Sequence, residues 1–243
     1  MKVGLLGLSN PCKNIESTQL YLKDKGYDVV VSPFLDQNTS GYTRAMLWNE
    51  WMQMDFDYIF DVSGGDLANE TIPYLDLDIY KNSHTIFCGY SDLTCVLNIL
   101  SIIRPSLLYQ VKISKEMDTS FDYAFLQGTQ MKGIVVGGNI RCFLKLAGTP
   151  YFPDCKNKIL FLESYSGNEN RIRTYFAQLK MIGVFDQING LILGQFSELD
   201  EKGISIPFNK EYYNGPIIRT MDIGHGKNSK AIWIGKELQL CSI

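Results

Sequence analysis

The segment His84-Thr-Ile-Phe-Cys-Gly-Tyr-Ser91-Asp-Leu-Thr94 decides how this chain folds, because it passes from strand to helix within a few residues. Residues 85–89 are mostly apolar and β-favouring, as in a strand buried on both faces. From Leu93 the apolar positions repeat with helical spacing, which predicts an amphipathic helix that runs to Pro105. Ser91 therefore falls on the tight turn between a buried strand and a helix N-terminus.

Ser91 has two interpretations. Serine is a favoured N-cap residue, so its hydroxyl can simply bond the first helical turn. Alternatively, the turn is a nucleophile elbow of the Gly-x-Ser-x-Gly type, which exposes the hydroxyl and aims free backbone N–H groups at the reacting group. Leu93 stands where that pattern has its last glycine. Capping is therefore the simpler interpretation unless the chain supplies catalytic partners.

Strands alternate with helices in the first hundred residues. The strands are predicted at 3–8, 27–32, 58–62 and 85–89, and the helices at 14–25, at 42–54 and after Ser91. This order implies right-handed crossovers and a parallel sheet covered on both faces. We therefore predict an α/β domain over residues 1–104.

The second half of the chain has a different pattern. Residues 105–130 are less regular and are predicted to connect two domains. Shorter strands follow at 133–136, 158–162, 191–196 and 217–221, with one helix over 170–182 that ends at Gly183. We predict a β-rich α+β domain over residues 131–243.

Composition narrows the function. The 243 residues are 45% hydrophobic and 20% charged, as in ordinary globular proteins, and the net charge of −3 argues against a nucleic-acid partner. Six scattered cysteines without a Cys-x-x-Cys pair predict reduced thiols in a cytoplasmic protein. We expect no signal peptide, no membrane span and, with two histidines and no clustered thiols, no metal site.

A serine hydroxyl needs a base, and the chain has two histidines. His84 begins the strand that ends before Ser91, so the two residues lie about 18–20 Å apart at ~3.3 Å per residue. His225 lies in Ile223-Gly-His-Gly226, where flanking glycines permit a sharp bend. A lone loop histidine is more often a surface residue. If Ser91 is a nucleophile, however, His225 is the base.

Glu163 is the candidate that orients this base. It ends the apolar strand at 158–162, where a carboxylate is costly unless it is paired or hydrogen-bonded. It can cap a backbone turn or pair with Arg171 or Arg173. The catalytic interpretation gains from the order Ser, Glu, His, in which each residue follows a predicted strand.

An oxyanion hole requires two donors that face the developing charge. The backbone N–H of Asp92 at the helix start is one candidate. The turn Gly64-Gly65 follows the neighbouring strand and reaches the same carboxyl edge of the sheet, where ligands bind in open α/β folds. A Gly-Gly pair alone would ordinarily be only a turn.

Several stretches together carry a resemblance to a known family. They are Gly64-Gly-Asp, Ile72-Pro-Tyr-Leu-Asp76, Ile86-Phe-Cys-Gly-Tyr-Ser-Asp-Leu-Thr94, Gly137-Gly-Asn139, Leu146-Ala-Gly-Thr-Pro-Tyr151, Ile159-Leu-Phe-Leu-Glu163 and Ile223-Gly-His-Gly226. With them the chain resembles the LD-carboxypeptidase family of serine peptidases, which includes the microcin C self-immunity peptidases. The resemblance spans nearly the whole chain in the right order.

The resemblance implies a Rossmann-like N-terminal domain, a β-rich C-terminal domain and an active site between them. It implies that Ser91 is the nucleophile, that His225 is the base and that Glu163 orients it. The N–H groups of Asp92 and of Gly64-Gly65 would form the oxyanion hole. The implied reaction releases the terminal D-alanine of murein tetrapeptides in the cytoplasm, without a metal or organic cofactor, in an enzyme that is often a dimer.

Two departures concern specificity. Ser63 stands where murein-cleaving members usually carry arginine, and only about 45 residues separate Ser91 from Gly137, fewer than the family has. The missing segment would wall the substrate pocket. The Gly64-Gly-Asp-Leu stretch leans towards the microcin branch, so the alternative is an immunity hydrolase that cleaves an aminoacyl-nucleotide or peptidyl-nucleotide amide.

Two further alternatives belong to other classes. A trimmed pocket is also compatible with a catalytically inactive binding protein of the same fold. A nucleotide-binding Rossmann protein is disfavoured, because the first strand leads into Gly7-Leu-Ser-Asn-Pro rather than a Gly-x-Gly-x-x-Gly fingerprint.

Overall fold

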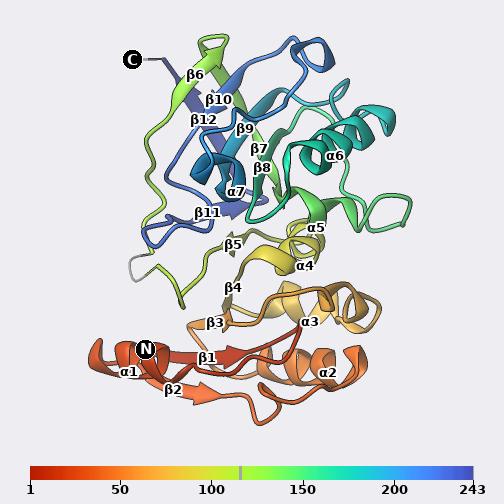
Figure 1. Ribbon diagram of the computed structural model, residues 1–243. Coiled ribbons are helices and arrows are strands. Elements are labelled where there is room, and N and C mark those ends of the chain that lie inside the picture. Colours follow the sequence, from red (N-terminus) through yellow and green to blue (C-terminus); the bar gives the residue numbers. More distant parts are fainter. Residues whose placement is uncertain (115–116, 243) are drawn as a thin grey trace.

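The computed structural model describes residues 1–114 and 117–242, and its strands form two six-stranded sheets. Residues 115–116 of the predicted connector, and residue 243 of the predicted second domain, lie outside the described residues. Figure 1 shows the two sheets in two halves of the molecule, with the N-terminal half drawn below the C-terminal half.

The first sheet has the strand order β11-β5-β4-β3-β1-β2. Its strands are β1 (Lys2–Leu6), β2 (Asp28–Val31), β3 (Tyr58–Asp61), β4 (Ile86–Gly89), β5 (Ser106–Leu108) and β11 (Ile232–Ile234). Strands β1 to β5 are parallel, and β11 pairs antiparallel with β5. The predicted parallel α/β sheet is confirmed. It also takes one strand from the predicted connector and one from the end of the chain.

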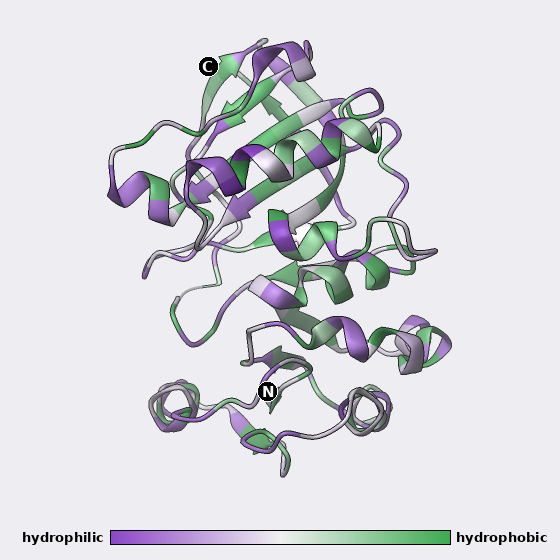
Figure 2. Ribbon diagram, turned by 45° about the vertical axis from the view of Figure 1, so that its right-hand side comes forward, coloured by the Kyte–Doolittle hydropathy of each residue, from purple (hydrophilic) through white to green (hydrophobic). Residues whose placement is uncertain are grey.

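Helices cover both faces of the first sheet. They are α1 (Glu16–Asp24), α2 (Gly41–Trp51), α3 (Leu77–Asn82) and α4 (Thr94–Leu100), with short 3₁₀ turns at η1 (Ala68–Glu70), η2 (Ile72–Tyr74) and η3 (Ser91–Leu93). Val3 and Leu5 pack with Leu22 of α1, whereas Leu6 packs in a separate cluster with Trp48 of α2. Successive side chains of β1 thus point to opposite faces. In Figure 2 these two helices are seen end-on at the bottom of the view, on either side of the N-terminal strands.

The second sheet has the order β12-β7-β8-β9-β10-β6. Its strands are β6 (Ala124–Gln127), β7 (Gln130–Asn139), β8 (Ile159–Ser164), β9 (Gly190–Phe196), β10 (Ile217–Arg219) and β12 (Glu237–Cys241). Its helical segments are α5 (Ile140–Leu144), α6 (Glu169–Met181), α7 (Ser197–Glu201) and η4 (Lys210–Tyr212). Strands β7 to β10 are parallel, and the two edge strands are antiparallel to them. The β-rich second half therefore has a parallel centre.

Helix α4 joins the two halves. Asn98 on α4 donates to the carbonyl of Gly137 and accepts from its N–H, both at 2.8 Å. The N–H of Asn139 donates to Thr94 Oγ1 at 2.9 Å. One apolar cluster continues from Leu97 of α4 to Phe161 of β8. The carboxyl ends of β7 and β8 are thereby fixed against the helix that follows Ser91.

Helix α4 is shorter than the sequence predicts. It ends at Leu100 rather than at Pro105, and the 3₁₀ turn at Ser91–Leu93 precedes it. The N–H groups of Ile102 and Ile103 bond three residues back, which tightens the chain before β5. Pro105 also disfavours helical geometry at the residue before it, Arg104, so the helix does not resume before β5.

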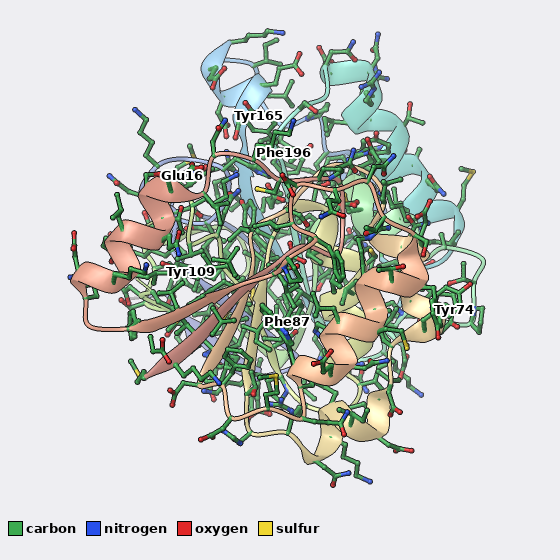
Figure 3. The ribbon with its side chains drawn as sticks, turned by 90° about the horizontal axis from the view of Figure 1, so that it is seen from below. Glu16, Tyr74, Phe87, Tyr109, Tyr165 and Phe196 are labelled. Carbon is green, nitrogen blue, oxygen red and sulfur yellow. The ribbon has the colours of Figure 1, made fainter. Side chains whose placement is uncertain are left out.

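None of the described helices has the length and apolar character needed to span a bilayer. Many large apolar side chains lie in the core, and others are exposed. Phe87 of β4 is fully buried and lies among the strands near the centre of Figure 3, whereas the exposed Tyr74 lies at the margin of that view.

Candidate active site

Ser91 occupies a strained turn. Its φ of +54° is in the left-handed region, which is uncommon for residues other than glycine. A Cβ on Gly89 would lie 2.8 Å from Leu93 Cβ, so only hydrogen fits at that position. The Ser91 hydroxyl caps no helix and makes no hydrogen bond with another described residue, so the capping interpretation is wrong. A strained serine between strand and helix has the geometry of a nucleophile elbow.

His225 and Glu163 are in direct contact. The Nδ1 atom of His225 lies 2.8 Å from Oε2 of Glu163, which is fully buried on β8. Asn139 Nδ2 donates to the other carboxylate oxygen at 3.0 Å. Both oxygens of the buried carboxylate are therefore satisfied. The predicted structural roles of Glu163, a backbone cap or a pair with Arg171 or Arg173, are wrong.

The contact fixes how His225 can act. Its side chain is only 8% exposed, so it is not the surface residue that a lone loop histidine usually is. With Nδ1–H donating to the carboxylate, the neutral ring has its lone pair on Nε2. That nitrogen can accept a proton.

Two tyrosines pack against the imidazole. Tyr90, which directly precedes Ser91, contacts the His225 ring edge-on at 4.6 Å between centroids, and its hydroxyl lies 3.3 Å from Nδ1. Burial, with a further contribution from the Glu163 charge, raises the pKa of Tyr90 well above its usual value, so the phenol stays neutral. Tyr165, labelled in Figure 3, also packs against His225, with 4.8 Å between the ring centroids, and it is 60% exposed. The imidazole of His225 is thus held beside the residue that precedes Ser91.

Three backbone N–H groups near the turn are free. Those of Gly64, Gly65 and Asp92 donate no hydrogen bond to another described residue. The Asp92 carboxylate is fully buried and is occupied elsewhere. It accepts from Ser9 Oγ at 2.6 Å and from the N–H of Ala68 at 2.9 Å, and it pairs with Lys145 Nζ at 2.5 Å.

The structure brings some of the predicted site residues together. His225 and Glu163 touch each other, and Tyr90 links them to the turn that carries Ser91. Lys145 Nζ bridges the carboxylate of Asp92 and the carbonyl of Asp66, which joins the two predicted donor segments. No hydrogen bond between Ser91 and His225 is present in the described chain.

His84 plays no part in this site. It is exposed and lies 3.2 Å from Asp55 at the opposite end of β4 from Ser91. The prediction that this histidine cannot serve Ser91 agrees with that position.

A cavity of about 1080 Å³ opens beside His225. Its lining is rich in lysine and polar side chains, namely Gln110, Lys112, Ile113, Ser114, Asp118, Tyr165, His225, Lys227, Asn228 and Lys230. Lys230 lies between Asp118 and Asp222, at 3.5 and 3.3 Å, so its charge is compensated. Lys112 and Lys227 form no ion pair with a described residue. They can attract an anionic group.

Sequence reasoning missed three residues at the site. Tyr90 and Asn139 lie inside the quoted motifs, next to Ser91 and at the end of Gly137-Gly-Asn139, and a polar or aromatic residue at such a position was the available signal. Lys145 had no signal, because its partner Asp92 lies on another half of the fold.

No group of three His, Cys, Asp or Glu side chains within residues 1–114 and 117–242 is arranged to hold a metal ion. The expected lack of a metal or organic cofactor stays a prediction.

Family models match both halves of the chain. A model described as the LD-carboxypeptidase N-terminal domain matches residues 3–103, and one described as the LD-carboxypeptidase C-terminal domain matches residues 132–240.

Curated relatives are distant but cover most of the chain. A probable murein peptide carboxypeptidase from Bacillus subtilis is 24% identical over 96% of this chain and 86% of its own. The microcin C7 self-immunity protein MccF from Escherichia coli is 26% identical over 75% of this chain and 70% of its own. A putative carboxypeptidase from Vibrio cholerae is 24% identical over 83% of this chain and 79% of its own.

Solved structures share the two-sheet fold. Wild-type MccF without ligand has a TM-score of 0.83 at 20% identity, over 98% of this chain and 92% of its own. Muramoyltetrapeptide carboxypeptidase from Oxalobacter formigenes has a TM-score of 0.82 at 18% identity, over 100% of this chain and 96% of its own. The fold and the two matched models together show that the chain belongs to the LD-carboxypeptidase family.

Proposed function

We propose that this protein is a serine-type carboxypeptidase that hydrolyses an amide bond through Ser91, with His225 as base and Glu163 as its orienting carboxylate. The observation that carries the proposal is the 2.8 Å contact between Glu163 Oε2 and His225 Nδ1. It leaves Nε2 as the basic nitrogen of a ring that packs against Tyr90, the neighbour of a strained serine.

The reaction has two halves. Ser91 Oγ attacks the substrate carbonyl carbon while His225 Nε2 takes the hydroxyl proton, and the N–H groups of Asp92 and of the Gly64-Gly65 turn bind the oxyanion. The C–N bond then breaks as His225 returns the proton to the leaving amine. Water next attacks the acyl-Ser91 ester, again with His225 as base. This step releases the acid product and regenerates the Ser91 hydroxyl. The Ser91–His225 hydrogen bond closes when substrate binds, as apo catalytic contacts are often long.

The cavity supports a small anionic substrate. Lys112 and Lys227 line it without an ionic partner among residues 1–114 and 117–242, so a carboxylate is attracted to the side of the site that holds His225. A peptide that ends in a free carboxylate has this chemistry. We propose the terminal D-alanine of a murein tetrapeptide as the leaving group, in line with the B. subtilis relative's name.

A second candidate substrate is an aminoacyl-nucleotide or peptidyl-nucleotide amide. MccF has been solved with aspartyl sulfamoyl adenosine and with glutamyl sulfamoyl guanosine. In this chain the exposed ring of Tyr165 lines the cavity, where a base can stack on it. The alternative of another class is a binding protein that has lost its activity.

Location and assembly belong to the same proposal. The six cysteines are free thiols, five of them buried, which suits a reducing compartment, and we place the enzyme in the cytoplasm. The homodimer expected from the family stays a prediction.

Mass spectrometry tests the function. Purified protein and its Ser91→Ala variant are each incubated with a murein tetrapeptide and, separately, with aspartyl sulfamoyl adenosine. We expect the wild type alone to release D-alanine from the first. Release of aspartate from the second alone would favour the nucleotide substrate. If neither compound is cleaved and both bind, the protein is a binding protein.

A further inference from the structure

The turn Gly64–Asp66 is held from two sides. Asn10, in the loop after β1, donates its N–H to the carbonyl of Gly64 at 3.2 Å and accepts from the N–H of Asp66 through Oδ1 at 2.8 Å. Arg141, on α5 of the other half, donates to the carbonyl of Gly65 at 2.9 Å and pairs with the Asp66 carboxylate. Polar groups on both sides of the turn are thus fixed.

These contacts orient the N–H of Gly65. In a trans peptide the carbonyl of Gly64 and the N–H of Gly65 point in opposite directions. Because that carbonyl faces the backbone of Asn10, the Gly65 N–H faces away from it, and no described residue accepts its proton. Gly65 has φ +116°, and a Cβ there would lie 2.4 Å from Asn10 Oδ1, so glycine is required.

The turn is also fixed to the segment that carries Ser91. Lys145 Nζ bonds the carbonyl of Asp66 at 2.8 Å and the Asp92 carboxylate at 2.5 Å. Ser9 Oγ donates to the same carboxylate at 2.6 Å and accepts from the N–H of Leu67 at 3.3 Å. The free N–H groups of Gly65 and Asp92 therefore belong to two segments that are linked through the side chains of Lys145 and Ser9.

We propose that Asn10 and Arg141 are positioning residues that hold the Gly65 N–H as the second donor of the oxyanion hole. The inference rests on the proposed function, because it assigns the stabilisation of the same acyl-transfer step. It also gives the loop Gly7-Leu-Ser-Asn-Pro a role other than nucleotide binding. Since Arg141 belongs to the half that carries His225 and Glu163, the docking of the halves sets the donor as well as the base.

The test compares Asn10→Ala and Arg141→Gln with the wild type. Arg173→Gln is the matched control, because Arg173 is an exposed arginine of the same half and touches neither turn. The first readout is the second-order rate at which a fluorophosphonate labels Ser91, since the phosphonyl oxygen of the adduct occupies the oxyanion hole. The second is kcat and KM on the peptide that the wild type cleaves. Circular dichroism and the melting temperature show which variants are folded.

Removal of one oxyanion donor costs about 10²–10³ in kcat, and a displaced donor costs less. We therefore expect labelling and kcat to fall about 10- to 100-fold in both variants, with KM changed less than about twofold. Arg141→Lys keeps the charge and one donor, so its rates are expected to lie between those of Arg141→Gln and the wild type. The control is expected to match the wild type.

Two other outcomes are separable. If the wild type is labelled at Ser91 and the folded variants are labelled at the same rate, the positioning role is overturned while the nucleophile stands. A rise in KM with unchanged kcat and labelling would also overturn it, because Asn10 and Arg141 would then act in substrate binding. If wild-type Ser91 is not labelled, the proposed function fails and this inference fails with it.

Discussion

His225 Nδ1 and Glu163 Oε2 lie 2.8 Å apart although 62 residues separate them in the chain. The carboxylate comes from β8 and the imidazole from the loop after β10, whereas Ser91 belongs to the other half of the molecule. Tyr90 connects the two halves, since it precedes Ser91 and contacts the imidazole. The proposed chemistry therefore depends on how the halves dock.

Glu163→Gln is expected to lower kcat by about 10³- to 10⁴-fold without unfolding the protein. In this variant Asn139 Nδ2 continues to donate to the side-chain oxygen of the new glutamine. The NH₂ group of the glutamine therefore faces His225 Nδ1. The ring must then accept at Nδ1 and carry its proton on Nε2, so it cannot act as a base. Steady-state kinetics measures the loss, and activity near the wild-type level would show that Glu163 does not set the tautomer.

Asn139→Ala is expected to lower both activity and stability. Its side chain donates to Glu163, and it also caps α5 by accepting from the N–H of Cys142. Loss of a hydrogen bond to a charged group lowers kcat by about 10- to 100-fold, and loss of the cap costs about 1 kcal/mol. Asn168→Ala is the control, because Asn168 caps α6 in the same way and does not touch Glu163. Equal kinetic losses in the two variants would contradict this role.

Ser91→Gly is expected to be more stable than Ser91→Ala by about 1 kcal/mol, although both lack the nucleophile. The left-handed backbone at Ser91 strains any residue with a Cβ, and glycine relieves that strain. Urea denaturation of the two variants measures the difference in the free energy of unfolding. Equal values would mean that the turn stores no strain.

Asp61 is expected to make stability depend on pH. Burial raises the pKa of its carboxyl group from 3.8 to about 6, although hydrogen bonds from Ser63 and Leu8 oppose the rise. Between about pH 4 and pH 6 the folded state keeps a proton that the unfolded state releases, so the free energy of unfolding falls as pH rises through this window. The fall should be smaller in Asp61→Asn. Parallel pH curves for the two proteins would refute the assignment.

The order of elements was predictable because its signals are local. Apolar periodicity and glycine stops fixed β1 to β4 and their helices to within a few residues, and the Ser91 turn followed from the change of period. The same signals predicted the helix at 170–182, which the structure has at Glu169–Met181.

Long-range pairing was not predictable in the same way. The pairing of β11 with β5 joins segments more than 120 residues apart, and neither segment carries a local signal that predicts its partner. The pair of Lys145 with the buried Asp92 also depends on contact between the two halves. The candidate site residues were identified from strand ends, residue types and their order along the chain, and the resemblance then assigned their roles, whereas Tyr90, which contacts His225, was missed.

The most direct test of the central claim compares Ser91→Ala, His225→Ala and the double variant in the hydrolysis of the peptide that the wild type cleaves. Residues that act as one unit lose their effect together, so we expect each single variant to lose at least about 10⁴-fold in kcat and the double variant to lose no more than the worse single one. Losses that multiply in the double variant, or a His225→Ala variant that retains most activity, would contradict the proposal that His225 activates Ser91.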